Sequence, residues 1–229
     1  MTIEDRLQEV RTEYLRRLTQ GDGDLLRQVE SYASARQGKM LRPRLTLLAA
    51  ATLGDDHLAS HRTLLLATAV EMLHNASLLH DDVIDHADSR RGQPSVNARW
   101  NNRVAILVGD YHLAQIMRLL DEVDDPTAAR RINDTVLAMV EGELLQQEIA
   151  NGRLLTADDY LRIIDGKTAR LFATACALGN PQYEEFGLHY GRLFQLRDDL
   201  ADGEATAFTD TLIADEERCL AAMQETLFI

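Results

Sequence analysis

The chain has 229 residues and a formal net charge of −13, with 45 % hydrophobic and 5 % aromatic residues. That length gives one large domain or two small ones, with enough residues for a sizeable buried core. The negative charge excludes a general nucleic-acid-binding protein, but a local metal cluster can still make a site attractive to an anionic substrate. Cys176 and Cys219 are the two cysteines, so neither a disulfide framework nor a zinc site is expected.

The amino-acid sequence shows neither a membrane-spanning segment nor a signal peptide. No run of about 18 apolar residues occurs, so we expect no transmembrane helix. The first residues, MTIEDRLQEVRTEYL, are charged and amphipathic and lack the apolar core of a signal peptide. We therefore expect a cytoplasmic protein.

Apolar residues recur every three or four positions along most of the chain, which predicts helices. The first predicted helix covers residues 3–18 and ends at the Gly21–Gly23 breaker. Nothing in the sequence predicts a strand, so we expect one all-α domain over residues 1–229, a bundle of about ten helices. The further predicted helices cover residues 25–36, 44–53, 60–85, 97–120, 127–151, 156–178, 182–202 and 212–227.

The stretch from Leu78 to Gly92, LLHDDVIDHADSRRG, combines acids with bases. Asp81 and Asp85 are four residues apart, so they share one face of a helix, and Asp82 lies between them. Arg90 and Arg91 follow closely. Carboxylates are hard ligands that suit Mg²⁺, and arginines bind phosphate oxygens. The stretch predicts a metal-bridged diphosphate site.

A second acidic set lies far downstream in FQLRDDLAD, as Asp198, Asp199 and Asp202. Each set directly follows apolar core-type sequence. Two sets facing one another would hold several Mg²⁺ ions around one diphosphate. The alternative is that each DDxxD belongs to a solvated helix face of an acidic protein. Lys167 interrupts an apolar helix and is either a functional cation or a lysine that snorkels at a helix edge.

Six segments together resemble the trans-isoprenyl diphosphate synthases, the polyprenyl synthetase family. Their order and spacing match that family over roughly residues 1–202. The segments are GKMLRP (38–43), EMLHNASLLHDDVIDHADSRRG (71–92), VAILVGDYHLA (104–114), EGELLQQ (141–147), KTARLF (167–172) and GRLFQLRDDLAD (191–202).

The resemblance implies an all-α fold around a central cavity and a Mg²⁺-dependent prenyltransferase. Such an enzyme condenses isopentenyl diphosphate with an allylic prenyl diphosphate. Several Mg²⁺ ions would bind to Asp81, Asp85, Asp198 and Asp202, with Asp82 and Asp199 supporting. Isopentenyl diphosphate would bind to Lys39, Arg42, His74 and Arg91, although His74 is open to a second interpretation as a core histidine. The allylic substrate would bind to Arg90, Lys167, Thr168 and Gln195, which are also the expected catalytic residues.

Two further expectations concern product and assembly. Ala76 and Ser77 lie one turn before the first acidic set, where the family sets product length, and both are small. We therefore expect a geranylgeranyl or longer product, with Met117 or Leu120 as other residues able to close the cavity floor. Family members are usually homodimers, and the apolar 104–117 stretch is either such an interface or part of the monomer core.

The C-terminal part departs from the family pattern, because only 27 residues follow Asp202 and none is lysine. Either the chain is a naturally short member, or further residues belong to it. Two alternative functions follow from the same residues. The first alternative is a regulatory or partner subunit of a hetero-oligomeric synthase. The second is a class I terpene synthase-like enzyme that ionises a prenyl diphosphate without condensation.

Overall fold

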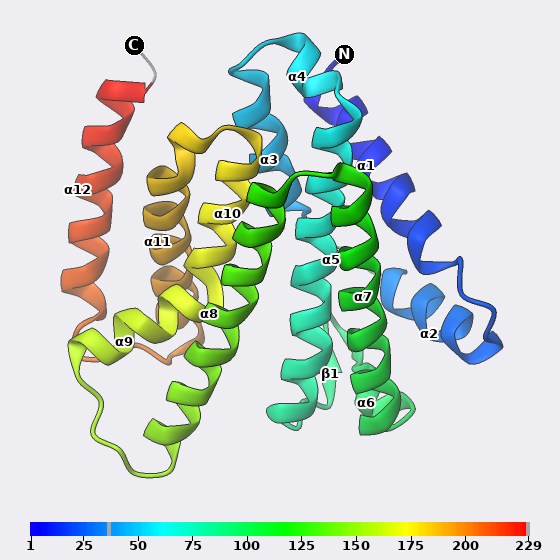
Figure 1. Ribbon diagram of the computed structural model, residues 1–229. Coiled ribbons are helices and arrows are strands. Elements are labelled where there is room, and N and C mark those ends of the chain that lie inside the picture. Colours follow the sequence, from blue (N-terminus) through cyan, green and yellow to red (C-terminus); the bar gives the residue numbers. More distant parts are fainter. Residues whose placement is uncertain (36–37, 228–229) are drawn as a thin grey trace. The chain divides into compact units, whose positions relative to one another are not determined.

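The computed structural model describes residues 1–35 and 38–227, and it is helical over almost all of them (Figure 1). The chain divides into two units, residues 1–125 and residues 126–229, which are described separately below. The expected all-α class is confirmed. None of the helices in the described ranges is both long and apolar enough to cross a membrane.

Helix α5 (His61–Ile84) is the centre of the N-terminal unit. It is buried along most of its length because its residues are apolar on nearly every side. It packs along α7 (Asn102–Val123), and also on α1 (Ile3–Leu18) and α3 (Leu41–Ala51), as Figure 1 shows. The C-terminal end of α5 carries the first acidic set, so this core fixes where that set lies.

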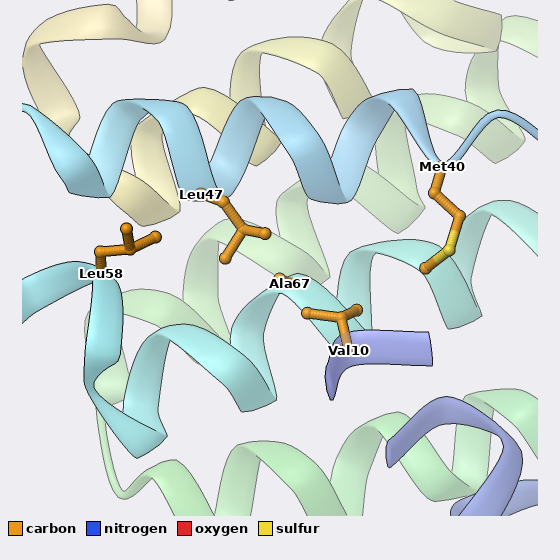
Figure 2. Packing of buried hydrophobic residues seen from close by; sticks show 5 residues of the cluster. All are labelled: Val10, Met40, Leu47, Leu58 and Ala67. Carbon is orange, nitrogen blue, oxygen red and sulfur yellow. The ribbon is translucent and has the colours of Figure 1, made fainter. Parts of the chain in front are cut away.

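The helices α1, α3, α4 (Asp55–Ala59) and α5 meet in one apolar cluster. Figure 2 shows its side chains pointing toward one another from these elements. They are Val10, Met40, Leu47, Leu58 and Ala67, all less than one tenth exposed. Their burial stabilises the unit by about 1.5–3 kcal/mol for each large side chain. The short helix α4, with Gly54 as its N-cap, lies between the helices predicted over 44–53 and 60–85, where the sequence predicted none.

A second short segment of the N-terminal unit corrects two predictions. Strands β1 (Ser89–Arg90) and β2 (Gln93–Pro94) form a small antiparallel hairpin where the sequence predicted no strand. The helix predicted over 97–120 is two helices, α6 (Val96–Arg99) and α7. The chain turns at Trp100, and the side chain of the N-cap Asn101 accepts a backbone N–H from the first turn of α7, that of Val104, at 3.0 Å. Helix α2 (Asp24–Ser34) also packs on α7.

The C-terminal unit is built around α10 (Arg170–Gly179). Its residues from Leu171 onward are all buried, because α8 (Pro126–Ala150) and α11 (Glu184–Asp202) cover it. Helix α9 (Ala157–Ile164) begins at Thr156, whose side chain accepts the backbone N–H of Asp159 at 3.1 Å, as the sequence predicted. Helix α12 (Thr209–Leu227) packs on α11 (Figure 1).

Candidate functional site

Two of the three acids in the first set point outward from the end of α5. Asp81 is in the last turn of the helix and is half-buried, and Asp85 is its exposed C-cap. The backbone N–H of Asp85 donates to the carbonyl of Asp81 at 2.8 Å, so the two residues remain one helical turn apart. The predicted sharing of a face is therefore confirmed in the local backbone, and both carboxylates are near solvent.

Asp82 is the exception, since its side chain is only 5 % exposed. Its Oδ1 accepts hydrogen bonds from Nε of Arg90, at 2.8 Å, and from the Nη2 of the same guanidinium. The backbone carbonyl of Asp82 accepts from the Asn97 side chain at 3.0 Å. Asp82 thus holds the hairpin onto the end of α5.

The two arginine side chains of the hairpin, Arg90 and Arg91, contact different residues. Arg91 and Gly92 form its two-residue turn with φ of 53° and 74°, and a turn with positive φ at both positions is the type I′ geometry. A non-glycine residue in this region costs about 1–3 kcal/mol. The guanidinium of Arg91 lies against Gly38, where an added Cβ would be 2.7 Å from Nη2. Arg90 turns to Asp82 instead, so the two neighbouring arginines have different neighbours.

Around Arg91 the structure gathers most of the residues predicted to bind isopentenyl diphosphate. Burial holds the pKa of His74 well below its ordinary 6.5, and the positive charges of Arg42, Arg91 and Arg90 lower it further. Burial also lowers the pKa of Arg42, to about 10, although the nearby Glu71 opposes that change. Lys39 is exposed and follows Gly38 directly in the chain. The basic cluster therefore comprises Arg42, His74 and Arg91, with Lys39 at its edge.

The neutral state of His74 has a measurable consequence for stability. An unfolded histidine takes up a proton near pH 6.5, whereas His74 in the folded protein does not until a much lower pH. The unfolded state then binds more protons, so stability falls as the pH drops below about 6.5. Glu71 acts in the opposite sense, because burial raises its pKa and its cost grows as pH rises above about 4.5.

We expect His74→Gln to lose less thermal stability than the parent between pH 7.5 and pH 5.5. Differential scanning calorimetry across that range measures the two slopes. The exposed His57 provides the control, since His57→Gln is expected to keep the parent slope. Equal slopes for His74→Gln and the parent would contradict this account of His74.

The residues predicted to set product length differ in burial. Ala76 is 1 % exposed inside the N-terminal unit, and Ser77 is half-buried with its hydroxyl donating to the carbonyl of His74 at 2.9 Å. Both remain candidates only. Met117 is 66 % exposed, and so is Leu107, so these two residues of the 104–117 stretch lie outside the core of the N-terminal unit. Leu120 is 9 % exposed.

The second acidic set repeats the pattern of the first within the C-terminal unit. Asp198 and Asp202 lie one turn apart on α11 and are exposed, whereas Asp199 is 9 % exposed. The Asp199 carboxylate accepts from the Tyr160 hydroxyl at 2.7 Å and from Nε2 of Gln195 at 2.6 Å. In both sets, the middle aspartate is turned inward and the outer two are left near solvent.

Lys167 and Thr168 lie on a π-helical turn, η1 (Asp165–Ala169), which joins α9 to α10. Our prediction of one regular helix over 156–178 missed this turn. A π-turn places one extra residue in the helix, and such turns are frequent at functional sites. Lys167 is exposed there, while Thr168 is buried and its hydroxyl donates to Oε1 of Gln195 at 2.5 Å.

Tight packing and one ion-pair network hold the π-turn in place. A Cβ on Gly166 would lie 2.5 Å from the carbonyl oxygen of Ala138 and 2.8 Å from Cα of Gly142, so η1 sits directly on α8. On the other side, Arg192 of α11 makes a bidentate ion pair with Asp165, at 2.6 and 2.7 Å. This pair raises the pKa of Arg192.

Within its own unit, each acidic set offers two carboxylates with some exposure to solvent and nearby polar groups. Within residues 1–35 and 38–227 no group of three or more His, Cys, Asp or Glu side chains is gathered in metal-binding positions. Asp82 and Asp199 accept hydrogen bonds within their own units. The outer pairs, Asp81 with Asp85 and Asp198 with Asp202, are hard oxygen donors of the kind Mg²⁺ prefers.

Sequence reasoning missed Tyr160 and Arg192. Both lie on helices with a clear apolar face, where a tyrosine is expected in the core and an arginine at the edge. Their distance along the chain from their partners gives no signal. Tyr160, for example, lies 39 residues before Asp199, and their contact joins α9 to α11. Only the tertiary arrangement reveals them.

The chain matches known proteins over most of its length. The family model for polyprenyl synthetase matches residues 23–211. An all-trans-nonaprenyl-diphosphate synthase (geranyl-diphosphate specific) from Rhodobacter capsulatus is 39 % identical over 197 residues, which are 82 % of this chain and 59 % of that protein. The octaprenyl diphosphate synthase of Escherichia coli (strain K12) is 34 % identical over 194 residues, covering 80 % and 59 % of the two chains. The chain thus spans 59 % of the length of each of these curated relatives.

Solved structures give the same result. A decaprenyl diphosphate synthase from Rhodobacter capsulatus superimposes with a TM-score of 0.82 at 33 % identity, covering 87 % of this chain and 64 % of that one. A polyprenyl synthase from Caulobacter crescentus CB15, complexed with calcium and isoprenyl diphosphate, gives a TM-score of 0.80 at 33 % identity. The match covers 86 % of this chain and 62 % of that one.

Proposed function

Because the chain belongs to the polyprenyl synthetase family, we propose that it is a magnesium-dependent trans-prenyltransferase. It condenses isopentenyl diphosphate with an allylic prenyl diphosphate to give a longer trans-polyprenyl diphosphate. The allylic C–O bond breaks first, the isopentenyl double bond then attacks the allylic cation, and loss of a proton restores the double bond. The released diphosphate takes up that proton.

The observation that carries this proposal is that Arg42 and Arg91 act on the buried His74, whereas the guanidinium of Arg90, whose charge also reaches His74, is hydrogen-bonded to Asp82 of the first acidic set. A condensing enzyme binds two diphosphates at once, so it needs two anion positions. A class I terpene synthase needs only the allylic position. A purely structural subunit needs neither the cluster nor the outward acids. The attachment of Arg90 to the first acidic set, in addition to the cations Arg42 and Arg91 near His74, therefore favours condensation over both alternatives.

The outward acids fit a divalent cation, so Asp81, Asp85, Asp198 and Asp202 are the proposed Mg²⁺ ligands. When bound, Mg²⁺ ions neutralise diphosphate oxygens and act as Lewis acids toward the leaving group. Asp82 and Asp199 support the site without binding the metal directly, because each accepts hydrogen bonds inside its own unit. Arg90 and Lys167 supply cations for the allylic diphosphate.

Thr168 and Gln195 serve the developing carbocation. Oxygen lone pairs aimed at a positive centre stabilise it electrostatically in a site that excludes water. Thr168 is suited to this because its single hydroxyl hydrogen is donated to Gln195, which leaves its lone pairs for the substrate. The buried helices α5 and α10 supply the apolar surroundings that delay quenching by water.

We expect Arg42→Gln to raise KM for isopentenyl diphosphate about 10- to 100-fold and to change kcat by less than about threefold. The range corresponds to a lost hydrogen bond to a charged group of about 1.5–3 kcal/mol. Steady-state kinetics at saturating allylic substrate measure both constants. Arg44→Gln is the matched control, because Arg44 is on the same helix but pairs with the exposed Glu4. A kcat loss with unchanged KM would contradict the assignment of Arg42.

Product length and assembly are parts of the same proposal. The small residues Ala76 and Ser77 support a product of geranylgeranyl length or longer, and the relatives named nonaprenyl and octaprenyl synthases support the longer end. The exposed Ile106, Leu107 and Met117 on α7 support a homodimer in which a second copy covers them. Light scattering on the purified protein tests the dimer. A cytoplasmic location is proposed with them.

An elongation assay tests the function as a whole. The purified chain is incubated with Mg²⁺, labelled isopentenyl diphosphate and allylic diphosphates of several lengths. Extended labelled products support the proposal, and their length gives the chain specificity. Diphosphate release from the allylic substrate alone, without elongation, would instead indicate the terpene synthase alternative. No turnover with any primer, together with activity after addition of a second subunit, would indicate the partner-subunit alternative.

A further inference from the structure

We infer that Tyr160 is a positioning residue for the second acidic set: through Asp199 it fixes the orientation of the Gln195 amide and, with it, the hydroxyl of Thr168. The inference deepens the proposed function and rests on it for its catalytic consequence. The hydrogen-bond arrangement itself does not depend on the function. All the residues involved belong to the C-terminal unit.

The Tyr160 hydroxyl lies between two helices that follow it in the chain. Its side chain is 6 % exposed and packs with Ile164 and Leu196 in one apolar cluster. Its oxygen is 2.7 Å from Oδ2 of Asp199 on α11 and 3.2 Å from Oγ1 of Thr209 at the start of α12. Thr209 is itself 1 % exposed. The phenol thus joins the acidic set to the loop that follows it.

The direction of these hydrogen bonds follows from the number of hydrogens. A phenol has one hydrogen, and an ionised carboxylate only accepts, so Tyr160 donates to Asp199. Thr209 must then donate to the phenol oxygen, and its own oxygen accepts the backbone N–H of Thr206 at 2.8 Å. Burial, the Asp199 charge and the Asp199 hydrogen bond outweigh Thr209 and raise the pKa of Tyr160 to about 12, which keeps it a donor across the working pH range.

The same carboxylate orients the Gln195 amide. With Oδ2 taken by the phenol, Oδ1 of Asp199 accepts from Gln195 at 2.6 Å, and only the amide nitrogen can donate there. The amide oxygen must therefore face Thr168, whose hydroxyl donates to it at 2.5 Å. Two chains of hydrogen bonds therefore end on the Asp199 carboxylate. In the first, Thr209 donates to Tyr160 and Tyr160 donates to Asp199. In the second, Thr168 donates to Gln195 and Gln195 donates to Asp199.

This polarity has a consequence for a cationic intermediate. Thr168 spends its only hydrogen on Gln195, so it can present lone pairs, but no hydrogen, to a substrate. If the Asp199 carboxylate turned away from Gln195, the amide would no longer face a group that only accepts, so it could flip and Thr168 would accept from the amide nitrogen. Its hydroxyl hydrogen would then point elsewhere, including toward the cation, where it would be repulsive. Tyr160 prevents that flip.

The test is Tyr160→Phe in the full chain with Mg²⁺. It removes one hydrogen bond and keeps the ring in its apolar cluster. We expect kcat for elongation to fall about 10- to 100-fold, the usual effect of removing a hydrogen-bonding partner from the outer shell of a metal site. KM for isopentenyl diphosphate should stay within about twofold, because its proposed site is in the other unit. Tyr190→Phe, the same change on the stacked Tyr190 of α11, should keep parent kinetics.

A spectroscopic measurement reports on the arrangement without requiring turnover. In the parent, the side-chain NH₂ signals of Gln195, identified with Gln195→Glu, should be shifted and protected from exchange. Tyr160→Phe should abolish both effects, and Thr209→Val should weaken them. If the parent elongates nothing, the proposed function fails while this measurement still decides the orientation. Unchanged Gln195 signals in Tyr160→Phe, or equal kcat losses in Tyr160→Phe and Tyr190→Phe, would overturn the inference.

Discussion

Asp85→Asn is expected to lower kcat by about 10²- to 10³-fold and to leave the melting temperature unchanged. The side chain is exposed, and the backbone bond that places it, from its N–H to the carbonyl of Asp81, does not involve the carboxylate. The loss comes from a weakened metal site, which is worth several kcal/mol of charge stabilisation at about 1.4 kcal/mol per factor of ten. Steady-state kinetics over a range of Mg²⁺ concentrations, with a parallel thermal melt, measure both quantities.

Two variants in the same segment serve as controls for that result. Asp88→Asn removes another exposed carboxylate of the same loop and should be neutral in both measurements. Asp82→Asn should lower both kcat and stability, because it takes the buried partner from Arg90. A melting temperature that falls for Asp85→Asn as much as for Asp82→Asn would contradict the distinction between outward and inward acids.

Gly166→Ala is expected to reduce the free energy of unfolding by about 2–3 kcal/mol, through overpacking. Its Cβ would lie 2.5 Å from a backbone oxygen of α8, and a backbone atom cannot move aside as a side-chain tip can. For a chain of this length the loss lowers the melting temperature by roughly 5–10 °C. It should also lower kcat, since Lys167 and Thr168 follow Gly166 directly on the π-turn.

Calorimetry and the elongation assay measure these effects. Gly23→Ala is the control, because a Cβ there meets nothing closer than 3.8 Å and its φ is −87°. We expect Gly23→Ala to cost less than about 1 kcal/mol. Equal losses at the two glycines would show that the close approach of η1 to α8 is not what sets the cost.

The regular helices were predictable because a buried face leaves a period of three to four in the sequence. The bounds of α1 at Ile3 and Leu18 agree with that pattern to the residue. The family followed from six motifs in order, without any tertiary information. The pairing of the outer acids in each set was also predictable from the sequence, since residues four apart on a helix share a face whatever surrounds them.

The irregular parts were not predictable because tertiary contacts decide them. The π-turn depends on the fit of Gly166 to α8, and neither residue pattern nor propensity marks it. The hairpin has strands of two residues and an arginine where asparagine or glycine is usual, so no turn signal was present. The inward orientation of Asp82 and Asp199 requires partners from other elements, Arg90 and Tyr160.

The turn at Arg91 places backbone preference and chemistry in conflict. At a φ of 53° glycine has the lowest conformational energy of the residues. Arg91→Gly would therefore lower the backbone strain while removing a cation from the basic cluster. A selection for heat resistance alone would therefore favour losing this guanidinium, whereas a selection for turnover would retain it. Engineering campaigns on this chain should keep Arg91 fixed and look for added stability elsewhere.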